Sequence, residues 1–560
     1  MSMRRSHGRA LFFLALVAAL SLAVAAAASP GGGDDFGDED EGSSGGGASG
    51  GGGGSNFSGG GGGSDFSGSG GGGGGGSVGL GRGLMVAIPW GIFGILVVAL
   101  VSASNRKNRA WTAGAAQRNA EADRAIAAMG LAPRARHPAV MQMLNAQRAQ
   151  RGLPLLLNTQ PHPQVPRRAL EALRATDPNF SVVLFEDFLY SLYAEVHTAR
   201  GEGRVAQLSA YLAPEVLTIL SQAQRGPVTR IVIGAMHYLS PPWWSAKPDE
   251  DLITAEIEAN YTETNARETR PAAEGVEGAQ RYFIRERWTL ARKRGALSRT
   301  PDRAKVFGCP SCGAPQGSVI AGTCQYCSKI VATGEFDWVV RNVELVTRKP
   351  RSPVPSGDSK DRGMDKLTVL DADVQARATA LQQRDPAFNW PQLQQRVGLI
   401  FNEFNVAWSA RDLAKMRPYM SDLLFSSQGH WIQNFNELHM RNVMENARLT
   451  NVELARVTSD RFYDALTVRI SAVALDYTIA DDGRLVAGNR TQERRYSEYW
   501  TLIRGVNRSG PTRTTPACPS CGAQLNINMA GDCAYCNAKV TTGDFDWVLS
   551  RIEQVSVYSG

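Results

Sequence analysis

Eight cysteines, all in one repeated spacing, are the residues of this chain most able to do chemistry. They form two groups with the pattern C-x2-C-x11-C-x2-C: Cys309, Cys312, Cys324 and Cys327, then Cys518, Cys521, Cys533 and Cys536. Each CxxC turn aims two thiolates at one point, so two such turns complete the tetrahedron that Zn²⁺ adopts in structural sites. Gly313 and Gly522 follow the second cysteine of their pairs and fit a tight turn. The pattern predicts two structural zinc ions per chain, because four thiolates leave no position for a catalytic water.

Thiol redox chemistry and disulfides are the alternatives to zinc. A redox CxxC of the thioredoxin type belongs in a βαβ context, whereas each pair here faces a second pair between predicted strands. Structural disulfides are disfavoured in the reducing cytoplasm. None of the seven histidines lies near the cysteines in the sequence, and no HExxH motif occurs. We therefore expect zinc held by thiolates alone.

The cysteine groups belong to a longer internal repeat. The motif CPSCGA occurs at 309 and 518, TGEFDW at 333 recurs as TGDFDW at 542, and DPNF at 177 recurs as DPAF at 385. An ordered series of matches at a near-constant offset indicates a duplicated domain. We assign the first copy to 167–347 with its ribbon at 309–327, the linker to 348–370, and the second copy to 371–557 with its ribbon at 518–536.

The elements that must position the cysteines follow the same order in both copies. Apolar residues at helical spacing predict a helix from Val182 to Tyr193 and another from Val397 to Trp408. Alternating apolar residues then predict strands at 253–261, 283–291 and 336–346, and at 466–474, 495–503 and 545–557. Helices followed by antiparallel strands imply an α+β fold with helices on one face of the sheet. Each ribbon would lie in the final hairpin of its sheet.

The N-terminal part of the sequence predicts a membrane anchor. Residues 1–28 have a basic start, an apolar run and small residues at the end, which is typical of a cleaved signal peptide or an uncleaved signal anchor. Residues 29–82 are mostly Gly and Ser and should be disordered. Residues 83–105 carry no charge and are long enough for a transmembrane helix. Basic residues begin the helical juxtamembrane linker, 106–166, so the Gly-rich segment lies outside and the repeats lie in the cytoplasm.

Charge gives little support to nucleic-acid binding. The net charge of +7 is modest for 560 residues. A basic run from Arg292 to Lys305 leads into the first ribbon, but the matching stretch of the second copy has fewer basic residues and no interleaved aromatics. Nucleic acid is therefore an unlikely partner, and a zinc-ribbon nucleic-acid-binding membrane protein is kept as an alternative.

Two motifs in each copy resemble a known family. They are E-x-W-T-L-x-R, at 286–292 and 498–504, and F-D-W-V, at 336–339 and 545–548. The family is named for Tim-forty-four, the peripheral subunit of the mitochondrial inner-membrane import machinery, and has bacterial relatives. The resemblance implies two tandem cone-shaped domains like nuclear transport factor two, each a curved antiparallel sheet around an apolar pocket. It also implies residence at a membrane surface, with contact to lipid or a protein partner. Together with the predicted anchor, we expect a single-pass protein of a bacterial inner membrane.

A non-enzymatic scaffold that binds protein segments or lipids, in protein transport or membrane-protein assembly, is the function we predict. Alternate strand residues would line its pocket, namely Ile257, Tyr261, Trp288, Ile470 and Trp500. A pocket enzyme of the cone fold is the other alternative, with Asp187, Glu286 or Glu498 as its buried acid. The ligand, the partner and the oligomeric state are not determined by the sequence.

Overall fold

The computed structural model describes residues 163–222, 226–240, 249–264, 279–351 and 362–560. Residues 163–351 are named the first half below, and residues 362–560 the second half. The predicted signal segment, Gly-rich segment and transmembrane helix, and nearly all of the juxtamembrane linker, lie outside the described residues. Within the described ranges, no helix combines the length and the apolar character that a membrane span requires.

Helices lead into the sheet in the first half. They are η2 (Arg167–Ala175), α4 (Val182–Gly201), η3 (Val205–Leu208) and α5 (Pro214–Gln222). Ser181 begins α4 as its N-cap, because its hydroxyl accepts a hydrogen bond from the backbone N–H of Leu184. The predicted helix is therefore present and continues beyond Tyr193, burying Val196 and His197 as well.

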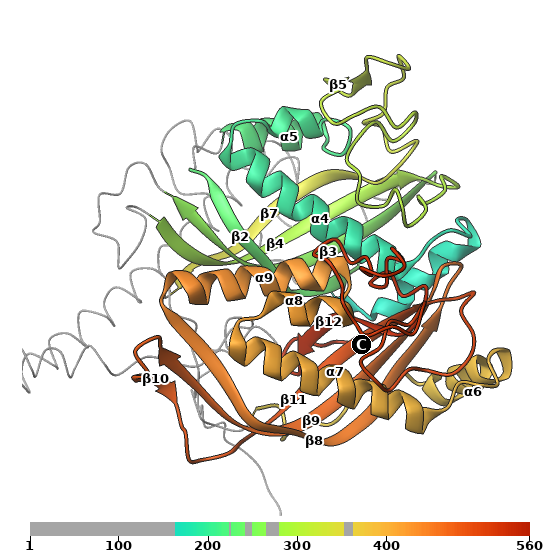
Figure 1. Ribbon diagram of the computed structural model, residues 1–560. Helices are drawn as coiled ribbons and strands as arrows, with labels where there is room; N and C mark the ends of the chain where they lie inside the picture. Colours follow the sequence, from blue (N-terminus) through green and yellow to red (C-terminus); the bar gives the residue numbers. More distant parts are fainter. Residues whose placement is uncertain (1–162, 223–225, 241–248, 265–278, 352–361) are drawn as a thin grey trace, which may run out of the picture. The chain divides into compact units, whose positions relative to one another are not determined.

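The first sheet is antiparallel, with the order β1–β2–β3–β4–β7. Its strands are β1 (Gln164–Val165), β2 (Val228–Leu239), β3 (Glu250–Thr264), β4 (Ala279–Lys293) and β7 (Val339–Arg351). Helices α4 and α5 lie over one face of this curved sheet (Figure 1). The first cysteine group lies between β4 and β7, with a small hairpin of β5 (Val319–Ile320) and β6 (Thr323–Cys324). The ribbon is thus inserted between two strands that pair with each other.

The second half repeats this order. Its helices are α6 (Val374–Arg384), α7 (Trp390–Ala410), α8 (Leu413–Met416), η5 (Arg417–Tyr419) and α9 (Asp422–Glu437). Its strands are β8 (Met440–Ser459), β9 (Tyr463–Ala480), β10 (Leu485–Gly488), β11 (Arg494–Gly505) and β12 (Val548–Gln554). All pairings are antiparallel: β9 lies between β8 and β11, β11 pairs with β12, and β10 pairs with the end of β9. The second cysteine group lies between β11 and β12.

Strands β2 and β8 were not predicted, and their bulges explain why. The register of β2 against β3 shifts twice, and that of β8 against β9 shifts three times. Arg230 in β2 and Asn446 in β8 also have positive φ angles. Each bulge shifts the alternation of side chains between the two faces, so no simple period of two remains to be recognised. The α+β class is confirmed, and the curved antiparallel sheets are compatible with the cone fold that the resemblance implied.

Each half has its own core, and the two halves belong to one compact unit. The core of the second half also takes in Val232 and Phe283 from the first. A buried ion pair joins the halves, with Arg167 Nη2 lying 2.8 Å from Glu553 Oε1. The described residues of the two halves are therefore packed against each other.

Candidate metal centres

Each CxxC turn closes through a residue with left-handed backbone. The N–H of Gly313 donates to the carbonyl of Cys309 at 2.9 Å, and the N–H of Ser328 donates to that of Cys324 at 2.9 Å. In the second ribbon, Gly522 and Asn537 close the turns in the same way. These four residues have φ angles of +80°, +57°, +76° and +57° in that order. Sequence reasoning found the two glycines but missed Ser328 and Asn537, although asparagine tolerates this conformation well.

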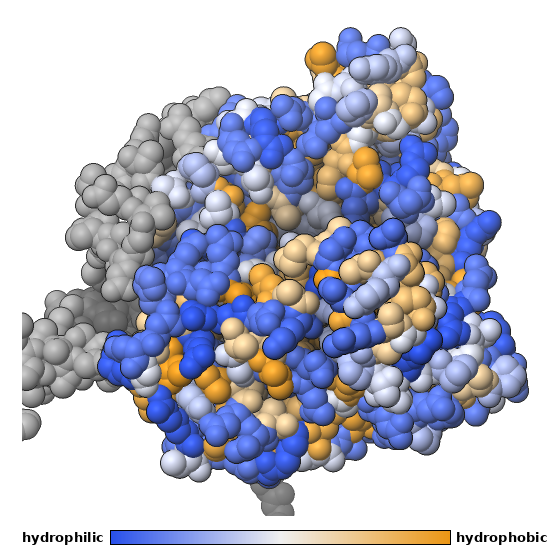
Figure 2. Space-filling model, in the orientation of Figure 1, coloured by the Kyte–Doolittle hydropathy of each residue, from blue (hydrophilic) through white to orange (hydrophobic). Residues whose placement is uncertain are grey.

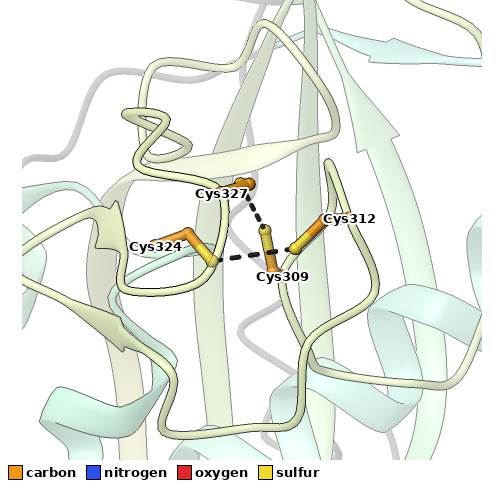
Figure 3. A group of neighbouring side chains, drawn as sticks. All are labelled: Cys309, Cys312, Cys324 and Cys327. Atoms are coloured by element: carbon orange, nitrogen blue, oxygen red, sulfur yellow. Dashed lines mark hydrogen bonds between the residues drawn. The ribbon is translucent and has the colours of Figure 1, made fainter.

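The four sulfur atoms of each group converge on one point. In the first ribbon, Cys309 Sγ lies 3.9 Å from Cys327 Sγ, and Cys312 Sγ lies 3.8 Å from Cys324 Sγ (Figure 3). In the second ribbon, the matching distances are 3.9 Å and 4.0 Å. A tetrahedron with Zn–S bonds of about 2.3 Å has S–S edges of roughly 3.8 Å, whereas a disulfide would bring two sulfurs to about 2.05 Å. The geometry therefore fits two structural zinc sites.

Backbone N–H groups make the second CxxC turn of each ribbon favourable for thiolates. Hydrogen bonds from the backbone of Cys327 and Tyr326 lower the pKa of Cys324 to about 6. A backbone hydrogen bond from Ala538 lowers the pKa of Cys536 to about 7. Burial instead raises the pKa of Cys309 to about 12. A bound cation offsets this last effect, because metal coordination deprotonates a thiol.

The first ribbon is held against the segment that joins η3 to α5 in its own half. The hydroxyl of Tyr211 donates to the carbonyl of Gly308 at 2.8 Å, and the hydroxyl of Ser209 donates to the carbonyl of Val319 at 2.8 Å. In the second half, Arg417 holds the ribbon from the matching place, with Nε donating to the carbonyl of Met529 at 2.9 Å. Both ribbons are therefore docked as well as inserted.

A buried arginine lies on the carboxyl-terminal part of β4 in the first half. Arg292 Nη1 lies 2.8 Å from Asp177 Oδ2, and its guanidinium lies 4.5 Å from the ring centroid of Trp338. Asp251 is a second carboxylate partner, at 3.8 Å. This arginine ties the start of the helical layer to β3, to β4 and to the F-D-W-V motif.

Arg504 makes the same three contacts in the second half. Its Nη1 lies 2.8 Å from Asp385 Oδ2, its Nη2 lies 3.6 Å from Asp464 Oδ2, and its guanidinium lies 4.6 Å from the centroid of Trp547. Parallel bridges also match: Leu212 pairs with Val340, and Met420 pairs with Leu549.

The glutamate of the E-x-W motif is buried in both halves. Trp288 Nε1 donates to Glu286 Oε2 at 2.9 Å, and Trp500 Nε1 donates to Glu498 Oε2 at 3.0 Å. In the first half, His197 Nε2 also lies 3.1 Å from Glu286 Oε2. Both glutamates were candidate acids from the sequence. The indole beside each of them and the imidazole beside Glu286 were not predicted.

These different neighbours separate the two pKa values. Burial raises the pKa of Glu286, but His197, Trp288 and Arg200 outweigh it and leave the pKa below the ordinary value of 4.5. Burial raises the pKa of Glu498 to about 7, despite the Trp500 hydrogen bond and the Arg494 charge. Asp187, the third candidate acid, lies 3.2 Å from Lys305 Nζ.

The five residues predicted to line an apolar pocket are packed in the two cores. They are Ile257, Tyr261 and Trp288 in the first half, and Ile470 and Trp500 in the second. A cavity of about 60 Å³ lies elsewhere, lined by residues that include Met236, Gln428 and Trp431. A smaller one of about 30 Å³ includes Phe185 and Trp338 in its lining. The pocket stays a prediction, and so does the enzyme that would need it.

The basic run before the first ribbon is largely paired with carboxylates. Arg299 Nε lies 2.7 Å from Asp337 Oδ2, and Arg294 Nε lies 3.3 Å from Asp251 Oδ1. Arg292 and Lys305 are paired as described above. This pairing lowers the positive charge available to a phosphate backbone, so it adds no support to the nucleic-acid alternative.

The described chain is an α+β protein with two four-cysteine metal sites. Residues 374–512 match the family model of the Tim44-like domain. The match begins at the first residue of α6 and ends before Cys518, so the second ribbon lies outside it. No curated protein matches this chain. The match confirms the resemblance in the second half.

Proposed function

We propose that this protein is a non-enzymatic scaffold, anchored in a bacterial cell membrane, that binds polypeptide segments during protein transport or membrane-protein assembly. The match of residues 374–512 to the Tim44-like domain carries this proposal, because that family links the fold to membrane protein transport. The uncharged stretch at 83–105 supplies the anchor, with basic residues after it that favour a cytoplasmic position for both halves.

The proposal includes two copies of the Tim44-like domain, at 167–347 and 371–557. Three observations support it: the sequence repeats, the strands have the same order, and Arg292 and Arg504 have the same kinds of partners. In each copy the zinc ion holds together the loop that joins the last two paired strands. Its role is to support the sheet, since a closed four-thiolate site offers no open position to a substrate.

We expect polypeptide segments to bind at the surface of the second half. Val406 on α7 is 63% exposed although it is apolar, and α7 lies within the matched region. An exposed valine on an otherwise amphipathic helix is a suitable position from which to sample a partner. Leu485 on β10 is also exposed and apolar, and it lies on a different element of the same half.

Site-specific photo-crosslinking in intact cells tests the proposal. A photoreactive residue replaces Val406 in the full-length protein, and another replaces Leu485 as the matched control. We expect the first to form adducts with exported or membrane-inserted polypeptides, and the protein to stay with the membrane in alkaline carbonate. Failure to form adducts at Val406, or equal adduct yields at Val406 and Leu485, would contradict the scaffold role placed on α7, and release by carbonate would contradict the anchor.

A further inference from the structure

The outer end of the first ribbon exposes three large apolar side chains. Ile320, Tyr326 and Ile330 are 61%, 73% and 61% exposed. None of them ligates the metal, and none is needed to close a CxxC turn. Single exposed apolar residues are common on protein surfaces, but three within the stretch 320–330 of one ribbon form a cluster that can meet an apolar surface.

Strand pairing places the two isoleucines on one face. Ile320 pairs with Thr323 in the β5–β6 hairpin, and Thr323 forms a bridge with Ile330. Residues directly opposite each other on paired strands project to the same face. Ile320, Thr323 and Ile330 therefore form a row on one face, here named the ribbon row. Figure 1 places β5 at the outer end of the ribbon, and Figure 2 shows hydrophobic surface there.

The charge of the ribbon side chains favours a bilayer interface. Residues 309–331 contain no aspartate or glutamate, and Lys329 is their only charged side chain apart from the cysteines. Tyrosine prefers the boundary between lipid headgroups and acyl chains, and isoleucine can enter the apolar side of it. A lysine next to such a row can bury its stem and keep its ammonium in water.

The second ribbon carries a different row at the same positions. Met529, Asp532 and Lys539 stand 209 residues after Ile320, Thr323 and Ile330. Asp532 and Lys539 form the matching bridge, so two charged side chains replace Thr323 and Ile330 on this face. Charged groups are costly to bring into an apolar layer. The chain thus contains its own comparison, because the exposed tyrosine is common to both ribbons, as Tyr326 and Tyr535, whereas two charged side chains stand only in the second row.

We propose that the ribbon row of the first half inserts shallowly into the membrane that anchors the chain. The inference rests on the proposed function, because the anchor at 83–105 is what keeps the ribbon near a bilayer. Residues 106–162 join that anchor to the first half, so the local concentration of lipid is high and a weak contact suffices.

A protein partner fits this surface less well. A stable protein interface buries about 1,200–2,000 Å² in total, which three side chains on a narrow hairpin cannot supply by themselves. A bilayer requires no complementary shape and accepts a small apolar row combined with a second attachment.

Lipid photolabelling of the full-length protein tests the inference. The chain is reconstituted into vesicles of phosphatidylcholine with a minority of phosphatidylglycerol, containing a lipid with a photoreactive acyl chain, and labelled peptides are mapped by mass spectrometry. We expect labels in 83–105 and in 318–331, and background labelling in 527–540. The double variant Ile320→Ser/Ile330→Ser should lower labelling of 318–331 roughly tenfold, since it removes most of the apolar area of the row.

The controls separate the two hypotheses. Met529→Ser is the matched variant in the second ribbon and should leave every label unchanged, and both variants should retain two zinc ions. Labelling of 83–105 with only background at 318–331 would overturn the inference and leave the proposed function standing. Absence of labelling at 83–105 would overturn the anchor itself. A protein adduct from a photoreactive residue at Tyr326 in native membranes, in place of lipid, would also overturn the inference.

Discussion

The glutamate of the E-x-W motif has two different electrostatic environments in the two halves. In the first half, an indole N–H and an imidazole both contact Glu286, and its pKa lies below 4.5. In the second half, Glu498 keeps the indole contact at 3.0 Å, and burial raises its pKa to about 7. Asn405 in α7 stands 208 residues after His197, the same offset that separates DPNF from DPAF, and its amide donates to the carbonyl of Phe401 instead. The loss of the imidazole contact is therefore one of the differences that separate the two glutamates, beside Arg200 near Glu286 and Asp476 near Glu498.

Apart from this difference, the two halves share the contacts that hold their sheets together. The arginine contacts, the docked ribbons and the sulfur geometry are nearly the same in both. The comparison indicates that the parts holding the sheet together are alike, whereas the buried carboxyl differs.

Zinc removal should have the largest effect. The wild-type protein should contain two zinc ions, and Cys312→Ser or Cys521→Ser should each reduce the content to about one, because each ribbon needs all four ligands. Thermal unfolding should show that the two substitutions destabilise the protein to a similar degree. Removing both zinc ions from the wild type with a chelator should lower its stability further than either single substitution does. Full zinc content in either variant would refute the four-thiolate assignment.

Removing the buried arginines should have the second-largest effect on stability. Arg292→Met and Arg504→Met each leave two carboxylates without their buried partner, which costs about 3–5 kcal/mol in comparable cases. Denaturant unfolding of the two variants should give similar losses of stability. The exposed Arg448, whose guanidinium pairs with Glu493 at the surface, offers a control, since Arg448→Met should leave the free energy of unfolding nearly unchanged. Strongly unequal losses for Arg292→Met and Arg504→Met would show that the halves are not supported alike.

The pH dependence of stability should then separate the halves. The pKa of Glu498 is raised, so its contribution is fully present below about 4.5, its ordinary value, and is lost as pH rises through about 7. Between these two pH values the free energy of unfolding of the wild type should fall by roughly 3 kcal/mol, and that of Glu498→Gln should not show this fall. Glu286 has a lowered pKa, so its contribution is present above its ordinary value and is lost as pH falls. Glu286→Gln should therefore destabilise the protein at neutral pH, as measured by unfolding at a series of pH values. If the difference in unfolding free energy between wild type and Glu498→Gln did not change with pH, the raised pKa of Glu498 would be contradicted.

The indole hydrogen bonds should give the smallest and most discriminating effect. Trp288→Phe removes a bond to a charged carboxylate and should cost about 2 kcal/mol from that bond, whereas Trp500→Phe below pH 7 removes a bond to a neutral carboxyl and should cost about 1 kcal/mol. Raising the pH should increase the cost of Trp500→Phe but not that of Trp288→Phe. Equal costs at every pH would show that both glutamates carry the same charge.

The metal centres could be predicted from the sequence because their ligands are close in the chain. Two CxxC turns and their separation define the site, and Gly313 and Gly522 mark the turns. The contact of His197 with Glu286 could not be predicted in this way, since a helix and a strand far apart in the sequence meet only after folding. Strands β2 and β8 were missed because bulges disturb their alternation. The resemblance found in the second half was correct, whereas pocket-forming side chains could not be distinguished from core side chains by alternation alone.

The place of each ribbon between two paired strands also bears on how fast the sheet can form. Pairing β4 with β7 requires the chain to close the loop spanning 294–338, and pairing β11 with β12 requires closing 506–547. A folded ribbon within the loop shortens its effective length, and each halving of that length saves about 0.6 kcal/mol of closure entropy. Since β7 and β12 lie at the edge of their sheets, we expect metal binding to precede the docking of these last strands. Zinc supply would then affect the rate at which the last strand of each sheet docks, as well as the final stability of the protein.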